Sequence, residues 1–170
     1  DGSDCQVVMV DVVGIDVERR RVVVAEGSAP YDYLVLAVGV RHDYFGNESW
    51  EGTAPGLKTI EDATEIRRRI LLAFESAEHE ADVEARRAAL TFAIVGGGPT
   101  GVELAGAIQS IASKTLPRED RNIDTATARV ILLGGGPRVR GGFPESPSAR
   151  AAADLRRLGV GVRVDTRVTD

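Results

Sequence analysis

Cysteine is nearly absent from this sequence, because Cys5 is the only one among 170 residues. One cysteine excludes an intramolecular disulfide and a CxxC redox or zinc motif within this stretch, and it weakly favours a reducing compartment. The two histidines, His42 and His79, lie in an expected loop and on a charged expected helix and have no partner pattern. No metal site is therefore expected.

Basic charge in excess and long apolar runs are also lacking. The 21 lysines and arginines are outnumbered by 26 aspartates and glutamates, which gives a net charge of -5. No nucleic-acid partner is expected, because nothing in this balance would displace phosphate counterions. No apolar run approaches the roughly 20 residues of a membrane-spanning helix. Since the chain opens at Asp1 and stops at Asp170 soon after an expected strand, we expect it to be a piece of a longer protein.

The first 58 residues have the pattern of short β-strands followed by a loop. Apolar and β-branched runs predict three strands that form an antiparallel meander, with a turn at Glu26-Gly27. These strands are expected at residues 6–13, 21–25 and 33–38. Polar, glycine and proline positions over residues 41–58 predict a loop or linker.

A helix is expected to begin after Thr59, because Thr59 and Asp62 have the spacing of a capping box. Apolar residues then recur on one helical face, with arginines and glutamates opposite them. That face comprises Ile66, Ile70, Ala73, Phe74, Ala77 and Ala81.

Strand and helix patterns alternate over the rest of the chain. Strands are expected at 90–95, 129–133 and 160–164, and helices at 100–113 and 147–158. This order predicts parallel strands with right-handed crossovers. The fold class is therefore α/β: a Rossmann-like parallel sheet with helices, preceded by a small antiparallel β-meander. We expect domains at 1–58 and 59–170, the second truncated at its C-terminus.

The glycines of one turn, at residues 96–101, have the pattern of a dinucleotide-binding site. Gly96, Gly98 and Gly101 form a GxGxxG pattern that follows a strand and opens a helix. The first glycine permits a tight turn, the second lets a pyrophosphate approach the backbone, and the third lets helix and strand pack closely. Free N–H groups and the helix dipole then favour the phosphates. The expected dinucleotide-binding residues are Gly96, Gly97, Gly98, Pro99, Thr100 and Gly101. A tight turn without a ligand and a methyltransferase loop are alternatives.

A second expected feature, an acidic residue after the next strand that would hold the ribose hydroxyls, is missing. Gly134 and Gly135 stand there instead. Arg138 and Arg140 follow closely and could meet a 2′-phosphate, which would favour NADPH. The simpler interpretation, which we favour, is that they are exposed loop cations.

Several segments together resemble one family. The run FAIVGGGPTGVELAG at 92–106 is similar to the NADH-binding turn of type II NADH dehydrogenases, the single-subunit FAD-dependent NADH:quinone oxidoreductases of the pyridine nucleotide-disulfide oxidoreductase superfamily. Further pieces occur in the family's order. They are YDYLVLAVG at 31–39, DYFG at 43–46, APGLKTIEDA at 54–63 and AFESAE at 73–78.

The resemblance implies an enzyme of which this chain is the central part. Residues 1–58 would be the meander portion of an FAD-binding domain and 59–170 most of an NADH-binding domain. NADH is the implied cofactor, with NADPH possible, and FAD is expected only in the full-length protein. The family's N-terminal flavin turn, its C-terminal flavin motif and its membrane-anchoring helices are absent from this sequence, so the chain alone is expected to be inactive. Quinone is the implied substrate.

The resemblance also implies a location and individual site residues. We expect a cytoplasmic protein, or one bound peripherally to the cytoplasmic face of the inner membrane through other regions, and open sheet edges allow a homodimer. Glu103 matches a family glutamate near the meeting place of nicotinamide and flavin, where it would orient the ring or relay a proton. A carboxylate favoured by the helix dipole is the alternative. Ala37 and Gly39 match a flavin-side Ala-Thr-Gly motif, with Val38 replacing the threonine.

Two other function classes stay open. The chain could be a non-catalytic fragment that binds a dinucleotide, or part of a related flavoprotein disulfide or ferredoxin reductase. The absence of CxxC in this stretch does not exclude the second, because that motif could lie upstream. The segments at 43–46 and 54–63 favour the quinone enzyme.

Overall fold

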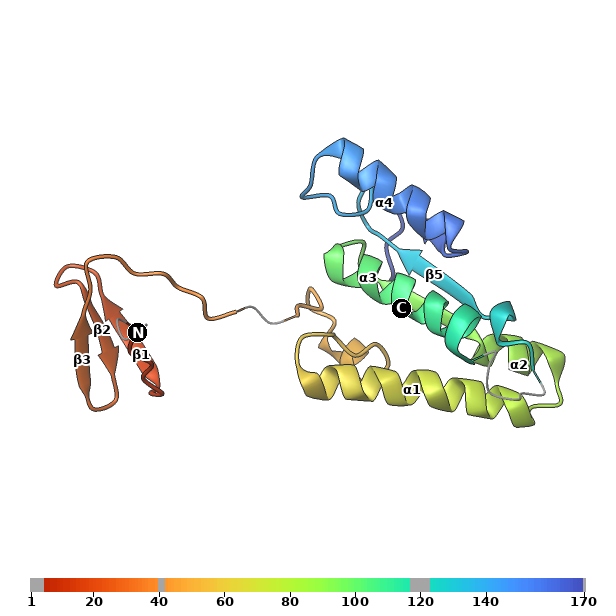
Figure 1. Ribbon diagram of the computed structural model, residues 1–170, viewed down its shortest axis with the longest axis horizontal. Coiled ribbons are helices and arrows are strands. Elements are labelled where there is room, and N and C mark those ends of the chain that lie inside the picture. The colour runs from red at the N-terminus through yellow and green to blue at the C-terminus, as the bar shows by residue number, and fades with distance from the viewer. Residues whose placement is uncertain (1–4, 40–41, 117–122, 170) are drawn as a thin grey trace. The chain divides into compact units, whose positions relative to one another are not determined.

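The structure is a computed structural model that describes residues 5–39, 42–116 and 123–169. The chain forms two compact units, one within residues 1–40 and the other within 41–170 (Figure 1). No helix of the described residues is long and apolar enough to cross a membrane.

The first unit is a three-stranded antiparallel sheet, which confirms the expected meander. Its strands are β1 (Val12–Asp16), β2 (Arg21–Val24) and β3 (Gly27–Pro30), in that order across the sheet. The prediction of a third strand at 33–38 is wrong. The turn at Ala25 and Glu26 folds the chain directly back, so that Val24 pairs with Gly27 and Arg21 with Pro30. Residues 33–38 pair with no strand among the described residues.

The first predicted strand is also shifted, since β1 begins at Val12 and residues 6–11 lie outside it. A run of β-branched residues favours a strand, but the strand extends only as far as the neighbouring strand offers pairing. Here β2 is only four residues long and offers no further pairing.

The second unit contains the expected parallel sheet. Its strands are β4 (Thr91–Val95), β5 (Arg129–Leu133) and β6 (Gly161–Arg163), in the order β4-β5-β6. Thr91 pairs with Arg129 and Ile131 with Gly161. The crossovers are α3 (Pro99–Ser110) and α4 (Glu145–Arg157), so the predicted β-α-β-α-β order is confirmed.

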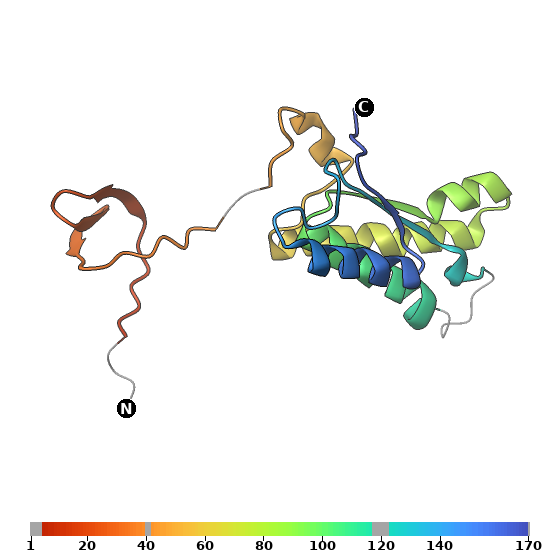
Figure 2. The same ribbon diagram turned by 90° about the horizontal axis from the view of Figure 1, so that it is seen from above.

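Three helices cover one face of this sheet. Figures 1 and 2 show α1 (Ile60–His79), α3 and α4 side by side in a single layer. The core between helices and sheet includes Phe74, Ile94, Ala105, Val130, Leu132 and Leu155. The opposite face is open, since Val95 is 54% exposed. The apolar strand β4 is therefore covered on one side only within the described residues.

Residues 42–58 pack with the second unit. They contain the short helix η1 (Glu48–Gly52), and the Arg69 guanidinium of α1 donates 3.0 Å hydrogen bonds to the carbonyls of Gly52 and Thr53. Arg69 also donates to Glu65. Hydrogen bonds from Arg68 and then Arg69 lower the pKa of Glu65 to about 2. The stretch expected to be a linker thus belongs to the compact unit at 41–170.

Several helical segments were not predicted. Helix α2 (Val83–Ala89) begins after Asp82, whose carboxylate accepts from the Ala85 N–H. Helix α3 continues as a π-helical turn at Ile111–Thr115, where the Thr125 hydroxyl donates to the Ala112 carbonyl at 2.8 Å. The short helix η4 (Thr125–Thr127) follows, and part of the predicted loop at 114–128 lies outside the described residues.

The start of α1 confirms the capping box. Thr59 accepts from the Asp62 N–H, and the Asp62 carboxylate accepts from the N–H groups of Thr59 and Lys58 at 2.9 Å. The bonds from Thr59 and then Lys58 hold the pKa of Asp62 below its ordinary value of 3.8. Because the unfolded chain binds the proton more readily, this stabilisation is present above the unfolded-state pKa. It is lost as the pH falls through the folded-state value.

Asparagine at position 62 is therefore expected to remove part of the acid sensitivity of the fold. Urea unfolding at about pH 6 and about pH 3 should show a smaller loss of stability for Asp62→Asn than for the unchanged chain. Glu61→Gln is the matched control, since Glu61 lies in the same helical turn and makes no capping bond among the described residues. Equal losses in all three proteins would contradict this role of Asp62.

Candidate functional site

The glycine turn joins β4 to α3 at the carboxyl edge of the parallel sheet. Gly96 has φ +119, a conformation that side chains disfavour, and its N–H donates to the Leu133 carbonyl at 2.8 Å. This bond ties the turn to the end of β5. The tight turn expected of the first glycine is therefore present.

Gly98 is the N-cap of α3 and lies beside open space. Its φ of -73 and ψ of 178 are allowed to any residue, and a Cβ built on it would meet no described atom within 4 Å. Its conformation therefore does not explain the glycine. The open space beside Gly98 leaves room for a ligand.

The N–H groups around this cap are available to a ligand. Among the described residues, those of Gly97, Gly98, Thr100 and Gly101 donate no hydrogen bond to the protein, while the Val102 N–H is the first to bond back, to the Gly98 carbonyl. Pro99, the first helical residue, has no N–H to satisfy. Four free donors at a positive helix end form an anion site, and the turn fits the pyrophosphate of a dinucleotide.

Gly101 has a different reason to be glycine. A Cβ there would lie 2.0 Å from the Gly96 carbonyl oxygen and 3.4 Å from Leu132 Cδ1. The start of α3 thus packs so closely against the turn and β5 that no side chain fits at position 101. This is the close helix–strand packing that the third glycine of the pattern predicts.

The end of β5 completes this edge of the sheet. Gly134 is buried beside Gly97, with its N–H bonded to the Arg163 carbonyl at 2.8 Å, whereas Gly135 is exposed. A Cβ on Gly134 would lie 3.6 Å from Gly97 Cα, in ordinary contact. Gly97 and Gly134, both predicted to bind the cofactor, are therefore brought together, and no acidic side chain of the described residues stands between them.

The loop after Gly136 places its two arginines differently. Arg138 is exposed and donates long bonds, of 3.3 and 3.4 Å, to the carbonyls of Gly141 and Phe143. Arg140 is half-buried, and its backbone N–H donates to the Gly97 carbonyl in the glycine turn. Arg140, rather than Arg138, therefore supports the turn directly.

Sequence reasoning missed this supporting role of the loop. Val139 is buried, and its Cα would lie 3.6 Å from a Cβ on Gly97. The one available signal was an apolar residue between two arginines in a glycine-rich loop. The positive φ of Arg140, 52°, could not be read from the sequence.

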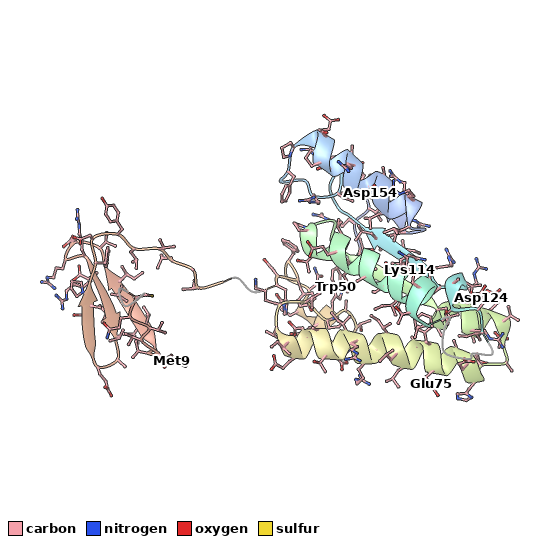
Figure 3. The ribbon with its side chains drawn as sticks, in the orientation of Figure 1. Met9, Trp50, Glu75, Lys114, Asp124 and Asp154 are labelled. Carbon is pink, nitrogen blue, oxygen red and sulfur yellow. The ribbon has the colours of Figure 1, made fainter. Side chains whose placement is uncertain are left out.

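Glu103 is the fifth residue of α3 and is exposed. No acidic residue lies in the first turn of this helix, and the influence of the dipole fades beyond that turn. Stabilisation by the helix dipole is therefore a weak explanation for this glutamate. Lys114, labelled in Figure 3, lies near the far end of the same helical run and takes no part in the turn.

The flavin-side candidates Ala37 and Gly39 lie in the first unit. Both are exposed, and Gly39 has φ +73. Ala37 lies within the segment at 33–38 that forms no strand here, and Gly39 directly follows it. Their role in binding flavin stays a prediction.

Fold and glycine turn together define a Rossmann-type α/β domain whose turn has the anion-binding geometry used for dinucleotides. The family model described as pyridine nucleotide-disulphide oxidoreductase matches residues 3–170. The chain therefore belongs to the pyridine nucleotide-disulphide oxidoreductase family.

Individual relatives confirm the resemblance to type II NADH dehydrogenases. The type II NADH:quinone oxidoreductase Ndh of Mycobacterium tuberculosis is 48% identical over 143 residues, which cover 84% of this chain and 31% of that protein. NdhA of the same organism is 44% identical over 140 residues, covering 82% and 30%. NDH2 from Plasmodium falciparum, solved in complex with NADH, shares the fold, with a TM-score of 0.72 at 24% identity over 95% of this chain and 34% of that one. The chain thus spans about a third of the length of these three relatives.

Proposed function

We propose that this chain is the NADH-binding part of an FAD-dependent NADH:quinone oxidoreductase. The observation that carries the proposal is the set of four unpaired N–H groups, those of Gly97, Gly98, Thr100 and Gly101, beside the open space at Gly98. Similarity to curated type II NADH:quinone oxidoreductases supports the reaction class. NADH is the expected cofactor of this chain, and FAD is expected only in the longer protein.

The chain's own residues would bind and orient the cofactor. The four N–H groups and the N-terminal end of α3 would hold the pyrophosphate, with Gly96 shaping the turn and Pro99 starting the helix. Gly134 and Gly135 would line the adenosine side. When bound, the nicotinamide supplies a hydride that the flavin accepts and passes to quinone as electrons. The protein's contribution is position, which removes the entropy of bringing two rings together.

Glu103 is proposed to act at the nicotinamide end, where it would orient the ring or relay a proton. Its exposure on α3 beyond the first turn supports this assignment over a purely electrostatic role in the helix. In the full-length enzyme, Glu103→Gln is expected to lower kcat about 100-fold if the carboxylate relays a proton. NADH affinity should stay unchanged. A kcat within about twofold of the unchanged enzyme would contradict any catalytic role.

The remaining assignments concern the longer protein. Residues 1–58 are proposed to belong to its FAD-binding domain, with Ala37 and Gly39 near the flavin, and 59–170 to its NADH-binding domain. Quinone is the proposed acceptor, which several relatives' names support. We further propose a cytoplasmic protein, or one bound peripherally to the cytoplasmic face of the membrane through other regions, that could form a homodimer.

A second candidate function is a binding module without catalysis. Gly134 favours it, because the acidic residue that usually holds the ribose is absent. Calorimetric titration of the chain with NADH tests the binding part common to both candidates. An assay of the full-length protein for NADH oxidation with a soluble quinone then separates them. Binding with no oxidation would support the module, and absence of binding to a folded chain would remove both.

A further inference from the structure

The adenosine side of the proposed site has lost the feature that normally excludes NADPH. In Rossmann domains an acidic residue after the second strand bonds the ribose 2′-OH, and its charge repels a 2′-phosphate. Here β5 ends in Gly134, Gly135 and Gly136. Gly134 lies beside Gly97 of the glycine turn, and the three atoms nearest to a Cβ built on Gly134 are all backbone atoms.

The loop that follows brings a cation whose hydrogen bonding is incomplete. The Nε atom of Arg140 is buried and has no hydrogen-bond partner among the described residues. The Arg140 guanidinium lies over the Phe143 ring, 4.0 Å from its centre, and its backbone N–H bonds the Gly97 carbonyl. The backbone is held at a φ of 52°. A buried donor without a protein partner is unfavourable unless a ligand or a water molecule satisfies it.

A second arginine adds positive charge to the same loop. Arg138 is exposed, and its guanidinium makes only bonds of 3.3 and 3.4 Å to loop carbonyls. Such weakly engaged donors are free to turn toward an anion. Arginine is the side chain that binds phosphate through paired N–H groups.

We infer that this chain accepts the 2′-phosphate of NADPH at the edge formed by Gly134–Gly136, Arg138 and Arg140, and so binds NADPH as well as NADH. The inference rests on the proposed function, because it concerns the same dinucleotide site. The missing carboxylate removes the repulsion, and the two arginines supply the attraction.

One carboxylate, that of Asp165, lies near this edge and would disfavour a bound 2′-phosphate. Asp165 follows β6, and its N–H donates to the Gly136 carbonyl at 2.9 Å. It comes after the third strand, not the second, where the ribose-binding acid belongs. If it nevertheless holds the ribose hydroxyls, Asp165→Asn will weaken NADH binding and the inference fails.

The direct test is a calorimetric titration of the folded chain with NADH and with NADPH at fixed salt. A dissociation constant for NADPH no more than about threefold above that for NADH supports the inference. A larger ratio, with NADH still bound, overturns it and leaves the proposed function standing. Absence of binding to either removes the proposed function itself. Adenosine 2′,5′-bisphosphate, which lacks the nicotinamide, should bind more tightly than AMP.

Variants assign the effect to these residues. Arg138→Gln is expected to weaken NADPH about tenfold and to leave NADH within about twofold. Arg140→Gln is expected to weaken NADPH more than NADH, because Arg140 also supports the glycine turn. Arg156→Gln is the matched control, because Arg156 lies in the last turn of α4, away from the loop at 134–143, and should change neither affinity. Gly134→Glu should restore preference for NADH, since its Cβ meets only ordinary contacts. An unchanged NADPH affinity in both arginine variants would overturn the assignment.

Discussion

Replacing Gly98 with valine is expected to abolish NADH binding and leave the chain folded. A side chain on Gly98 would project into open space, into which the pyrophosphate must come to reach the N–H groups of Gly97, Thr100 and Gly101. We expect affinity to fall at least about 100-fold, a free-energy loss of about 2.7 kcal/mol. The backbone angles at Gly98 are allowed to valine, so the loss of helix capping should cost no more than about 1 kcal/mol.

The matched control is Gly52→Val. Gly52 also has no described atom within 4 Å of a built Cβ, and its φ is not positive, but it lies in η1 and not in the glycine turn. Calorimetry with NADH and urea unfolding should show normal binding and near-normal stability for this variant. Binding that survives Gly98→Val would show that the phosphates lie elsewhere, whatever the family.

The parts of the fold that the sequence predicts correctly depend on contacts within a few residues. The capping box at Thr59 and Asp62 is such a case, because both partners lie in one helical turn. The strand at 129–133 is another, since a continuous apolar run bounded by glycine has few alternatives. The glycine turn was predictable because strand, turn and helix all lie within about 20 residues.

The errors involve pairing partners that propensity does not specify. Residues 33–38 are as apolar and β-branched as a strand should be, yet the short turn at Ala25 and Glu26 gives β2 a nearer partner. Closing a two-residue turn costs less chain entropy than closing the longer loop that would bring residues 33–38 back to β2. The segment keeps its exposed apolar side chains, including Val35 at 85% and Val38 at 90%.

The same limit applies to the candidate site. Spacing alone identified Gly96, Gly98 and Gly101, but not the different reasons for which Gly98 and Gly101 are glycines. Nor could it show that Arg140 bonds Gly97, because the two are more than 40 positions apart and the contact depends on a positive φ. The absence of an acid at Gly134 was visible in the sequence. The structure adds that Gly134 and Arg140 both contact Gly97 of the glycine turn.

Replacing Gly101 with alanine should act on folding where Gly98→Val acts on binding. The new methyl group would lie 2.0 Å from the Gly96 carbonyl oxygen, a backbone atom that can move only if the turn or α3 moves. Such overpacking is expected to lower the free energy of unfolding by about 3 kcal/mol. The better helix propensity of alanine returns only about 1 kcal/mol. NADH binding should be lost as well, because the displaced turn no longer presents its N–H groups together.

Gly106→Ala is the control that isolates the contact from the general effect of glycine in a helix. Gly106 lies in α3, and a Cβ there would meet Leu155 and Leu158 at 3.9 and 4.0 Å, which is ordinary packing. This variant should be stabilised by about 0.5–1 kcal/mol in urea unfolding. Equal stabilisation of Gly101→Ala would show that helix and turn do not approach closely. The arrangement of the four free N–H groups at the turn would then be wrong.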